Sequence, residues 1–289
     1  MFEIIQKQEQ YQTYVMTDLQ AQSEIEIVPE RGAIITRWRV KEEEILYLDR
    51  ERFTHPELSI RGGIPILFPI CGNLPNNTYT YQNQTYQLKQ HGFARDLPWE
   101  VISTNNQDCA SITLALRSNE QTLMVYPFEF KILFTYQLKG NSLRILQTYS
   151  NQSEAMMPFA TGLHPYFQVE DKNKLQFEIP GTFYQDQISQ ETYPFTGKFD
   201  FTQTEIDVAF TQIDKHHTAI ADSNKKLKIS INYSDCYTTL VFWAIKGKDY
   251  VCLEPWTAPR NALNTQEKLI WLEPGNSYES VVEINLSYF

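Results

Sequence analysis

The sequence predicts an all-β protein built as a large antiparallel sandwich, and three observations lead to this fold class. Phe128–Leu138 carries an apolar residue at every second position, which is the pattern of a half-buried strand. Gly140 and Asn141 then form a typical hairpin turn, and Leu143–Tyr149 is the returning strand. Finally, the chain shows no amphipathic helix longer than about two turns.

The N-terminal part is expected to hold four strands. In the second of them, two isoleucines alternate with two glutamates. Pro29–Gly32 is predicted to be a turn, and the acidic run Glu42–Glu44 to be a solvated loop. The four predicted strands are Tyr11–Val15, Glu24–Val28, Ala33–Val40 and Ile45–Leu48.

Arg61–Asn77, with the sequence RGGIPILFPICGNLPNN, does not fit a regular element. Its glycines and prolines predict an ordered loop with a short buried segment. Gly62 and Gly63 allow the backbone to approach a ligand closely, and Arg61 beside them is a candidate anion-binding group. A surface arginine in a turn explains the local pattern equally well. Tyr79–Leu88 then predicts a small hairpin.

Further strands are expected from Trp99 to the end of the chain. Asn119–Met124 is predicted to form one short helical turn, whereas Tyr184–Asp214 is expected to form loops over one face. No linker-like change in composition divides the chain, so residues 1–289 are predicted to form a single domain. The expected strands are Trp99–Ser103, Ser111–Arg117, Leu175–Ile179, Leu227–Tyr233, Thr239–Ile245, Tyr250–Leu253, Lys268–Leu272 and Glu279–Leu286.

Composition narrows the functional class. The formal net charge is −10 and no basic run exceeds Lys225–Lys226, which disfavours nucleic-acid binding. The N-terminus does not resemble a signal peptide, and no apolar run is long enough to span a membrane. The cysteines are scattered without a CxxC pair, so neither a disulfide framework nor a zinc site is expected. They are interpreted as buried residues of a cytoplasmic protein, namely Cys71, Cys109, Cys236 and Cys252.

Tyr250–Thr265 is the stretch with the clearest chemical potential. Because a residue before proline favours an extended conformation, Glu254 is expected at the last position of a strand. A carboxylate beside Trp256 is a candidate general base with a tuned pKa. A simple ion pair between Glu254 and Arg260 is the alternative.

His164 is the candidate partner for that base. It lies in the stretch MMPFATGLHPYF, where a glycine and a proline exclude an ordinary helix interior. Histidine is the side chain most easily poised near neutral pH. By contrast, His216 and His217 are interpreted as surface residues, because adjacent residues of a strand point to opposite faces.

Five segments of the chain, taken in order, resemble the aldose 1-epimerase (mutarotase) family. They are RGGIPILFP, QHGFARDLPW, GLHPYF, TEIDVAF and CLEPWTAPRNALNT. The resemblance is to the branch of hexose-6-phosphate mutarotases and covers Arg61–Thr265. It implies the galactose mutarotase-like β-supersandwich, a sugar or sugar phosphate as substrate, and no metal or organic cofactor.

The resemblance also implies a role for each matching residue. His164 is the expected general acid and Glu254 the expected general base. His91 and Asp207 are expected to bind the sugar, with Asp200 and Asp214 as nearby alternatives to Asp207. In the phosphate-using branch, Arg61 and Arg95 are expected to contact the phosphate.

Anomer exchange requires removal of the proton from the C1 hydroxyl and protonation of the ring oxygen. This chemistry requires His164 to be charged while Glu254 is ionised, so the pKa values of the two groups must be ordered accordingly. Two other functions stay open: a non-catalytic carbohydrate sensor on the same fold, and a glycoside hydrolase, which needs two carboxylates. A free hexose competes with a hexose 6-phosphate as substrate, since the alternative role of Arg61 and Arg95 is structural, braced by Asp96 and nearby acidic groups. A monomer is expected.

Overall fold

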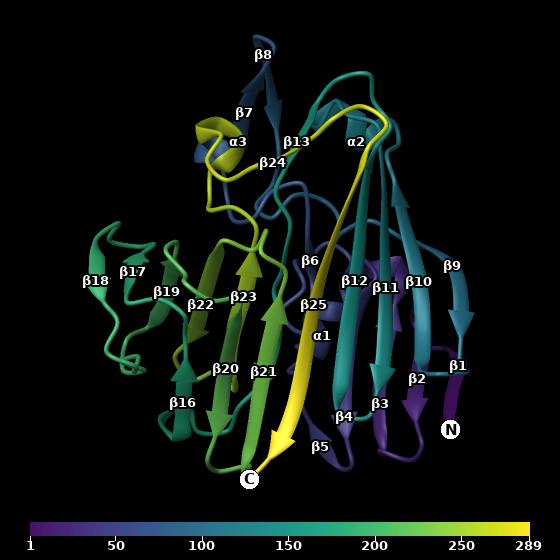
Figure 1. Ribbon diagram of the computed structural model, residues 1–289, viewed down its shortest axis with the longest axis vertical. Helices are drawn as coiled ribbons and strands as arrows, with labels where there is room; N and C mark the ends of the chain where they lie inside the picture. The colour runs from purple at the N-terminus through teal and green to yellow at the C-terminus, as the bar shows by residue number, and fades with distance from the viewer.

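The computed structural model describes residues 1–289, and antiparallel strands dominate it (Figure 1). The first sheet has five strands in the order β1 (Phe2–Gln8), β2 (Gln12–Asp18), β3 (Ser23–Val28), β4 (Ile34–Val40) and β5 (Glu43–Glu44). The second sheet has eight strands in the order β16 (Leu175–Glu178), β20 (His217–Asp222), β21 (Leu227–Tyr233), β25 (Ser277–Tyr288), β12 (Ser142–Asn151), β11 (Phe130–Lys139), β10 (Ala110–Arg117) and β9 (Glu100–Asn105).

The third sheet, also of eight strands, carries most of the residues singled out in the sequence. Its order is β18 (Thr192–Pro194), β17 (Phe183–Asp186), β19 (Glu205–Phe210), β22 (Thr239–Ile245), β23 (Tyr250–Trp256), β14 (Gly162–Leu163) and β6 (Ile66–Leu67), and β15 (Tyr166–Gln168) also pairs with β23. Two small ribbons complete the strands: β7 (Thr78–Tyr81) with β8 (Gln84–Gln87), and β13 (Met157–Phe159) with β24 (Ile270–Leu272).

The helices are short. They are α1 (Arg50–Thr54), α2 (Glu120–Val125), α3 (Ala262–Thr265) and the 3-10 turns η1 (Pro29–Arg31), η2 (Pro75–Asn77) and η3 (Lys172–Lys174). None of them is long and apolar enough to cross a membrane. The predicted helical turn at Asn119–Met124 is α2, and it forms because Asn119 and Thr122 cap each other's backbone N–H groups.

One contiguous core of 58 buried residues extends from Tyr14 to Leu286 and draws on all three large sheets. Trp38 of β4, Phe134 of β11 and Phe242 of β22 are fully buried in it. Burying each such side chain contributes about 1.5–3 kcal/mol, so the sheets hold one another in place. This shared core supports the single-domain organisation, which stays a prediction.

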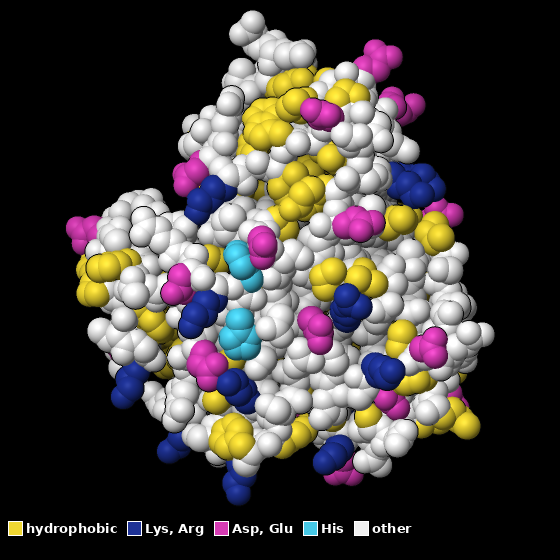
Figure 2. All heavy atoms as spheres, in the orientation of Figure 1, with side chains coloured by type: hydrophobic (Ala, Val, Ile, Leu, Met, Phe, Trp, Pro, Cys, Tyr) yellow, Lys and Arg dark blue, Asp and Glu magenta, His cyan; other side chains and the backbone are white.

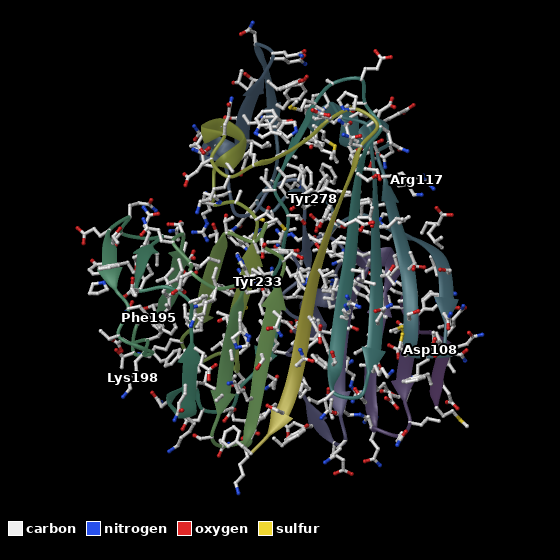
Figure 3. All side chains as sticks on the ribbon, in the orientation of Figure 1. Asp108, Arg117, Phe195, Lys198, Tyr233 and Tyr278 are labelled. Carbon is white, nitrogen blue, oxygen red and sulfur yellow. The ribbon has the colours of Figure 1, made fainter.

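The two sides of the molecule carry the outer strands of different sheets, β17 and β18 of the third sheet and β9 and β10 of the second. Phe195 and Lys198 mark the loop-rich region around β17 and β18 at one side, and Asp108 and Arg117 mark the β9–β10 edge at the other (Figure 3). Figure 2 shows acidic and basic side chains intermixed on the face of the molecule over the second sheet, with no continuous basic patch.

The strand prediction needs corrections near the N-terminus. β1 was not predicted, because none of its side chains is fully buried and its alternation is weak. Ile45–Leu48 is not a strand: Leu46 and Leu48 form only isolated bridges, to Phe167 and Gly62. The acidic run expected as a loop pairs with β4 as β5, because Arg37 and Lys225 neutralise its glutamates.

The segment Tyr184–Asp214 is also more regular than expected. It contains β18, β19 and most of β17. These strands form despite the polar composition because aromatic side chains pack across them, including Tyr184 against Phe210 at 5.7 Å between ring centroids. This ordered edge of the third sheet places Asp207 of β19 beside β22, one strand away from β23.

Candidate active site

The third sheet and the loops beside it enclose a cavity of about 200 Å³. All six residues that the sequence singled out line this cavity, although they come from distant parts of the chain. They are Arg61, His91, Arg95, His164, Asp207 and Glu254. Asp200 and Asp214, the alternatives to Asp207, do not line it.

Glu254 lies where the ladder on one side of β23 is interrupted. On that side β23 pairs with β15 up to Cys252 and with β14 at Trp256, which leaves residues 253–255 without a registered partner. Pro255, which lacks an N–H group, falls within this gap. β23 therefore continues to Trp256, and the prediction that Glu254 ends the strand is wrong.

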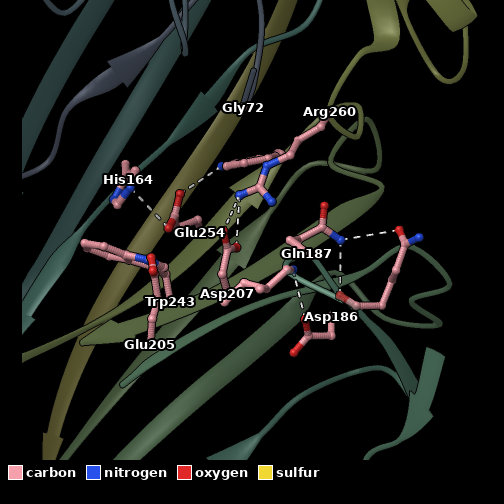
Figure 4. A network of polar contacts seen from close by, with 12 residues as sticks. Gly72, His164, Asp186, Gln187, Glu205, Asp207, Trp243, Glu254 and Arg260 are labelled. Carbon is pink, nitrogen blue, oxygen red and sulfur yellow. Dashed lines mark hydrogen bonds and ion pairs between the residues drawn. The ribbon is translucent and has the colours of Figure 1, made fainter. Parts of the chain in front are cut away.

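His164 occupies the matching gap between β14 and β15 and meets Glu254 there (Figure 4). Its Nε2 atom lies 3.3 Å from Oε1 of Glu254. The other carboxylate oxygen, Oε2, accepts a hydrogen bond of 3.1 Å from Nε1 of Trp256. The His164 ring stacks on Tyr166 with 4.7 Å between centroids, while its Nδ1 atom has no hydrogen-bond partner. The two groups that could exchange protons with a sugar thus face one cavity.

His91 is fixed in one tautomer by the backbone. Its Nδ1 atom accepts a hydrogen bond of 3.0 Å from the N–H group of Gly72, so the ring proton lies on Nε2. Gly72 has a φ of +71°, and a Cβ atom there would lie 2.2 Å from Cγ of Arg260. Glycine is therefore required at this position, and it leaves His91 with an N–H donor for a ligand.

Asp207 and Arg260 form an ion pair that the sequence did not suggest. Nη2 of Arg260 donates to both carboxylate oxygens of Asp207 at 2.9 Å (Figure 4). The alternative pairing of Arg260 with Glu254 is therefore wrong. Because each carboxylate oxygen retains a free lone pair, Asp207 can still accept a hydrogen bond from a ligand.

Arg61 and Arg95 line the cavity without an acidic partner within 4.0 Å. The guanidinium group of Arg61 lies 4.9 Å from the ring centroid of Trp243, whose Nε1 donates to Glu205 at 2.7 Å. Arg95 donates from Nη2 to the backbone oxygen of Gln90, and its buried Nε has no partner. Asp96 forms no ion pair with either arginine, although its charge partly opposes the lowering of the Arg95 pKa by burial. Two arginines that line the cavity without an ion-pair partner favour an anionic ligand.

Burial shifts the pKa values of the two central groups in opposite directions. It raises the pKa of Glu254 well above its usual range, and the nearby Asp207 carboxylate adds to this shift. It lowers the pKa of His164 well below the usual range, and the Arg95 guanidinium adds to that shift. Desolvation favours the neutral form of each group. Burial therefore favours the neutral pair with the shared proton on Glu254, and it opposes the state with charged His164 and ionised Glu254 that the reaction requires.

The predicted surface histidines take no part in the site. His216 lies 3.6 Å from Asp235, whereas His217 lies 3.7 Å from Glu178, so the two rings have separate partners.

Comparison with known proteins identifies the family. The model of the aldose 1-epimerase family matches residues 17–285, which is nearly the whole chain. The chain belongs to the aldose 1-epimerase family. This match includes every residue that lines the cavity.

Solved structures of similar proteins agree with the fold. The Slr1438 protein from Synechocystis sp. PCC 6803 is 46% identical over 100% of both chains, with a TM-score of 0.96. A galactose mutarotase-like protein from Clostridium acetobutylicum has a TM-score of 0.84 at 19% identity, over 100% of this chain and 99% of that one. The predicted all-β, galactose mutarotase-like fold class is thus confirmed.

One relative carries a more specific name. A protein of Cenchrus ciliaris that is provisionally named glucose-6-phosphate 1-epimerase is 26% identical over 280 residues, which cover 88% of this chain and 79% of the relative.

Proposed function

We propose that this member of the aldose 1-epimerase family interconverts the α and β anomers of a hexose 6-phosphate. The observation that carries the proposal is the contact between His164 and Glu254, 3.3 Å apart, in a cavity that also presents Arg61 and Arg95. General acid–base catalysis needs two groups that exchange protons with one substrate at the same time.

In the proposed reaction, the sugar is opened from the state with ionised Glu254 and protonated His164. Glu254 removes the proton from the C1 hydroxyl while His164 donates a proton to the ring oxygen. The bond between C1 and the ring oxygen breaks, and C1 becomes an aldehyde carbon. Rotation about the bond between C1 and C2, followed by the reverse proton transfers, closes the ring with the other configuration.

The pKa shifts favour this direction of proton flow. Ring opening leaves Glu254 protonated and His164 neutral, which is the state that burial stabilises. The cost lies in reaching the charged pair beforehand. A phosphate dianion bound by Arg61 and Arg95 offsets the positive charges that lower the pKa of His164, so a phosphorylated substrate helps to charge its own acid.

The remaining cavity residues supply orientation. His91 presents an Nε2–H donor to a sugar oxygen, and Asp207 accepts from a hydroxyl group while it stays paired with Arg260. Uncharged aldoses lack the phosphate contacts, so we expect them to be turned over more slowly.

Two-dimensional exchange NMR of the anomeric protons tests this function. Protein added to glucose 6-phosphate should accelerate exchange between the anomers, and added to glucose it should do so less. If neither sugar nor galactose exchanges faster than in buffer, although one of them binds, the protein is a carbohydrate sensor and the proposal of catalysis is wrong.

A further inference from the structure

Cys252 is a buried thiol beside the active site that the proposed reaction does not use. It lies two residues before Glu254 on β23, so both side chains are on the same face of the sheet. A ring nitrogen of His164, the Sγ atom of Cys252 and a carboxylate oxygen of Glu254 all lie within 4.8 Å of one another. All three residues are buried, but His164 and Glu254 also line the cavity, which gives the cluster access to solvent.

We propose that His164, Cys252 and Glu254 form a binding site for a thiophilic divalent cation such as Zn²⁺, and that occupation of this site blocks the catalytic pair. Imidazole nitrogen, thiolate sulfur and carboxylate oxygen are the donors that zinc prefers. Three protein ligands leave the fourth tetrahedral position open toward the cavity, where a water molecule or an anion completes the coordination.

The distances need little adjustment. Zinc bonds of about 2.0–2.3 Å in a tetrahedron place the donor atoms roughly 3.3–3.8 Å apart. Nε2 of His164 and Oε1 of Glu254 are already 3.3 Å apart. The longest separation of the cluster, up to 4.8 Å, must shorten by about 1 Å to reach this range. Because Nδ1 of His164 has no hydrogen-bond partner, its ring can turn toward the metal without breaking a bond.

The charges also balance. The metal binds a neutral imidazole, a carboxylate and a thiolate, so the proton shared by His164 and Glu254 and the thiol proton of Cys252 both leave to solvent. The buried group is then neutral before and after binding. Arg61 and Arg95 oppose a cation in the cavity, and a chloride ion in the fourth position would offset their charge. Arg260 is already neutralised by Asp207.

Titration of the purified protein with Co²⁺, a spectroscopic substitute for Zn²⁺, tests the site without any turnover. We expect saturable binding of one equivalent, with the visible bands of a tetrahedral ion and a thiolate-to-cobalt charge-transfer band, and displacement by Zn²⁺. Cys252→Ala should lose the charge-transfer band and bind at least about 100-fold more weakly, since even outer-shell changes cost 10–100-fold. Cys71→Ala is the matched control, because Cys71 is also a buried cysteine but lies outside the cluster, and it should bind as the wild type does.

Circular dichroism establishes whether both variants are folded. If Cys252→Ala does not fold, X-ray absorption spectroscopy of the zinc-loaded wild type in chloride-free buffer decides instead, and it should show one sulfur ligand. The proposal is overturned by the absence of saturable binding, by bound metal without a sulfur ligand, or by unchanged affinity in folded Cys252→Ala.

The inhibitory part of the proposal rests on the proposed function. Zn²⁺ should stop anomer exchange, and a chelator should restore it. If the protein has no epimerase activity, the cobalt spectrum still reports the metal site, so failure of the function and failure of the site are distinguishable.

Discussion

Replacement of Trp256 by phenylalanine tests the protonation state of the catalytic pair. Nε1 of Trp256 donates to Oε2 of Glu254 and thereby stabilises the carboxylate form. A hydrogen bond to a charged group contributes about 1.5–3 kcal/mol, so its loss should raise the pKa of Glu254 further. If about half of that stabilisation persists in the transition state, kcat/KM at its plateau should fall roughly 4- to 13-fold.

The pH profile of kcat/KM carries the sharper signature. Because burial favours the shared proton on Glu254 in the free site, we expect the alkaline limb of the profile to report the loss of that proton. Trp256→Phe should therefore move the alkaline limb to higher pH and leave the acid limb in place. Exchange NMR across a range of pH measures this profile. Trp38→Phe is the control for the loss of a buried indole ring, because Trp38 donates to Ser23 and does not line the cavity. A shift of the acid limb with an unchanged plateau would refute the reasoning, because it would place the shared proton on His164.

Three further predictions address the neighbours of the pair. Arg95→Ala should lower kcat/KM for glucose 6-phosphate by about 10- to 150-fold but barely change kcat/KM for glucose. Phosphite added together with glucose should activate the wild type more than the variant. Equal losses for both sugars would contradict phosphate binding by Arg95. Burial lowers the pKa of His91, so the folded state resists protonation, whereas the unfolded state gains a proton below pH 6.5. Through this residue, the stability of the wild type should fall by up to about 1.4 kcal/mol for each unit by which the pH decreases. In urea unfolding between pH 7 and 5, the stability of His91→Gln should depend less steeply on pH. Gly72→Ala should lose about 2 kcal/mol more stability than Gly140→Ala. Both glycines have a positive φ, but only a Cβ atom at position 72 would meet other atoms. Equal decreases in the melting temperature of the two variants would contradict the packing of Gly72 against Arg260.

The sequence was sufficient for the fold class through the alternation of its strands, and for the six cavity residues through five short motifs that resemble one family. The interruption of β23 beside Glu254 needed the register of three separate strands, which a propensity argument does not contain. The proline rule placed the end of the strand one residue before Pro255, whereas pairing with β22 carries the strand on to Trp256.

Long-range contacts account for the other differences. Arg260 pairs with Asp207, which is 53 residues away, although Glu254 is much nearer in sequence. The functional argument considered only the protonation states that the reaction requires, whereas the desolvation of His164 and Glu254, which opposes those states, depends on burial that the sequence does not contain. The position of Cys252 beside Glu254 needs no long-range contact, because two residues separated by two positions on a strand have their side chains on the same face.

The central claim is that His164 and Glu254 act together as one acid–base couple. Its most direct test is the anomeric exchange rate of glucose 6-phosphate in His164→Gln, Glu254→Gln and the double variant, all confirmed to be folded. We expect each single substitution to lower the rate by about 10²–10⁴-fold, and the double substitution to be little worse than the slower single one, since residues that act as a unit are not additive. A single variant within tenfold of the wild-type rate, or losses that multiply in the double variant, would contradict the account.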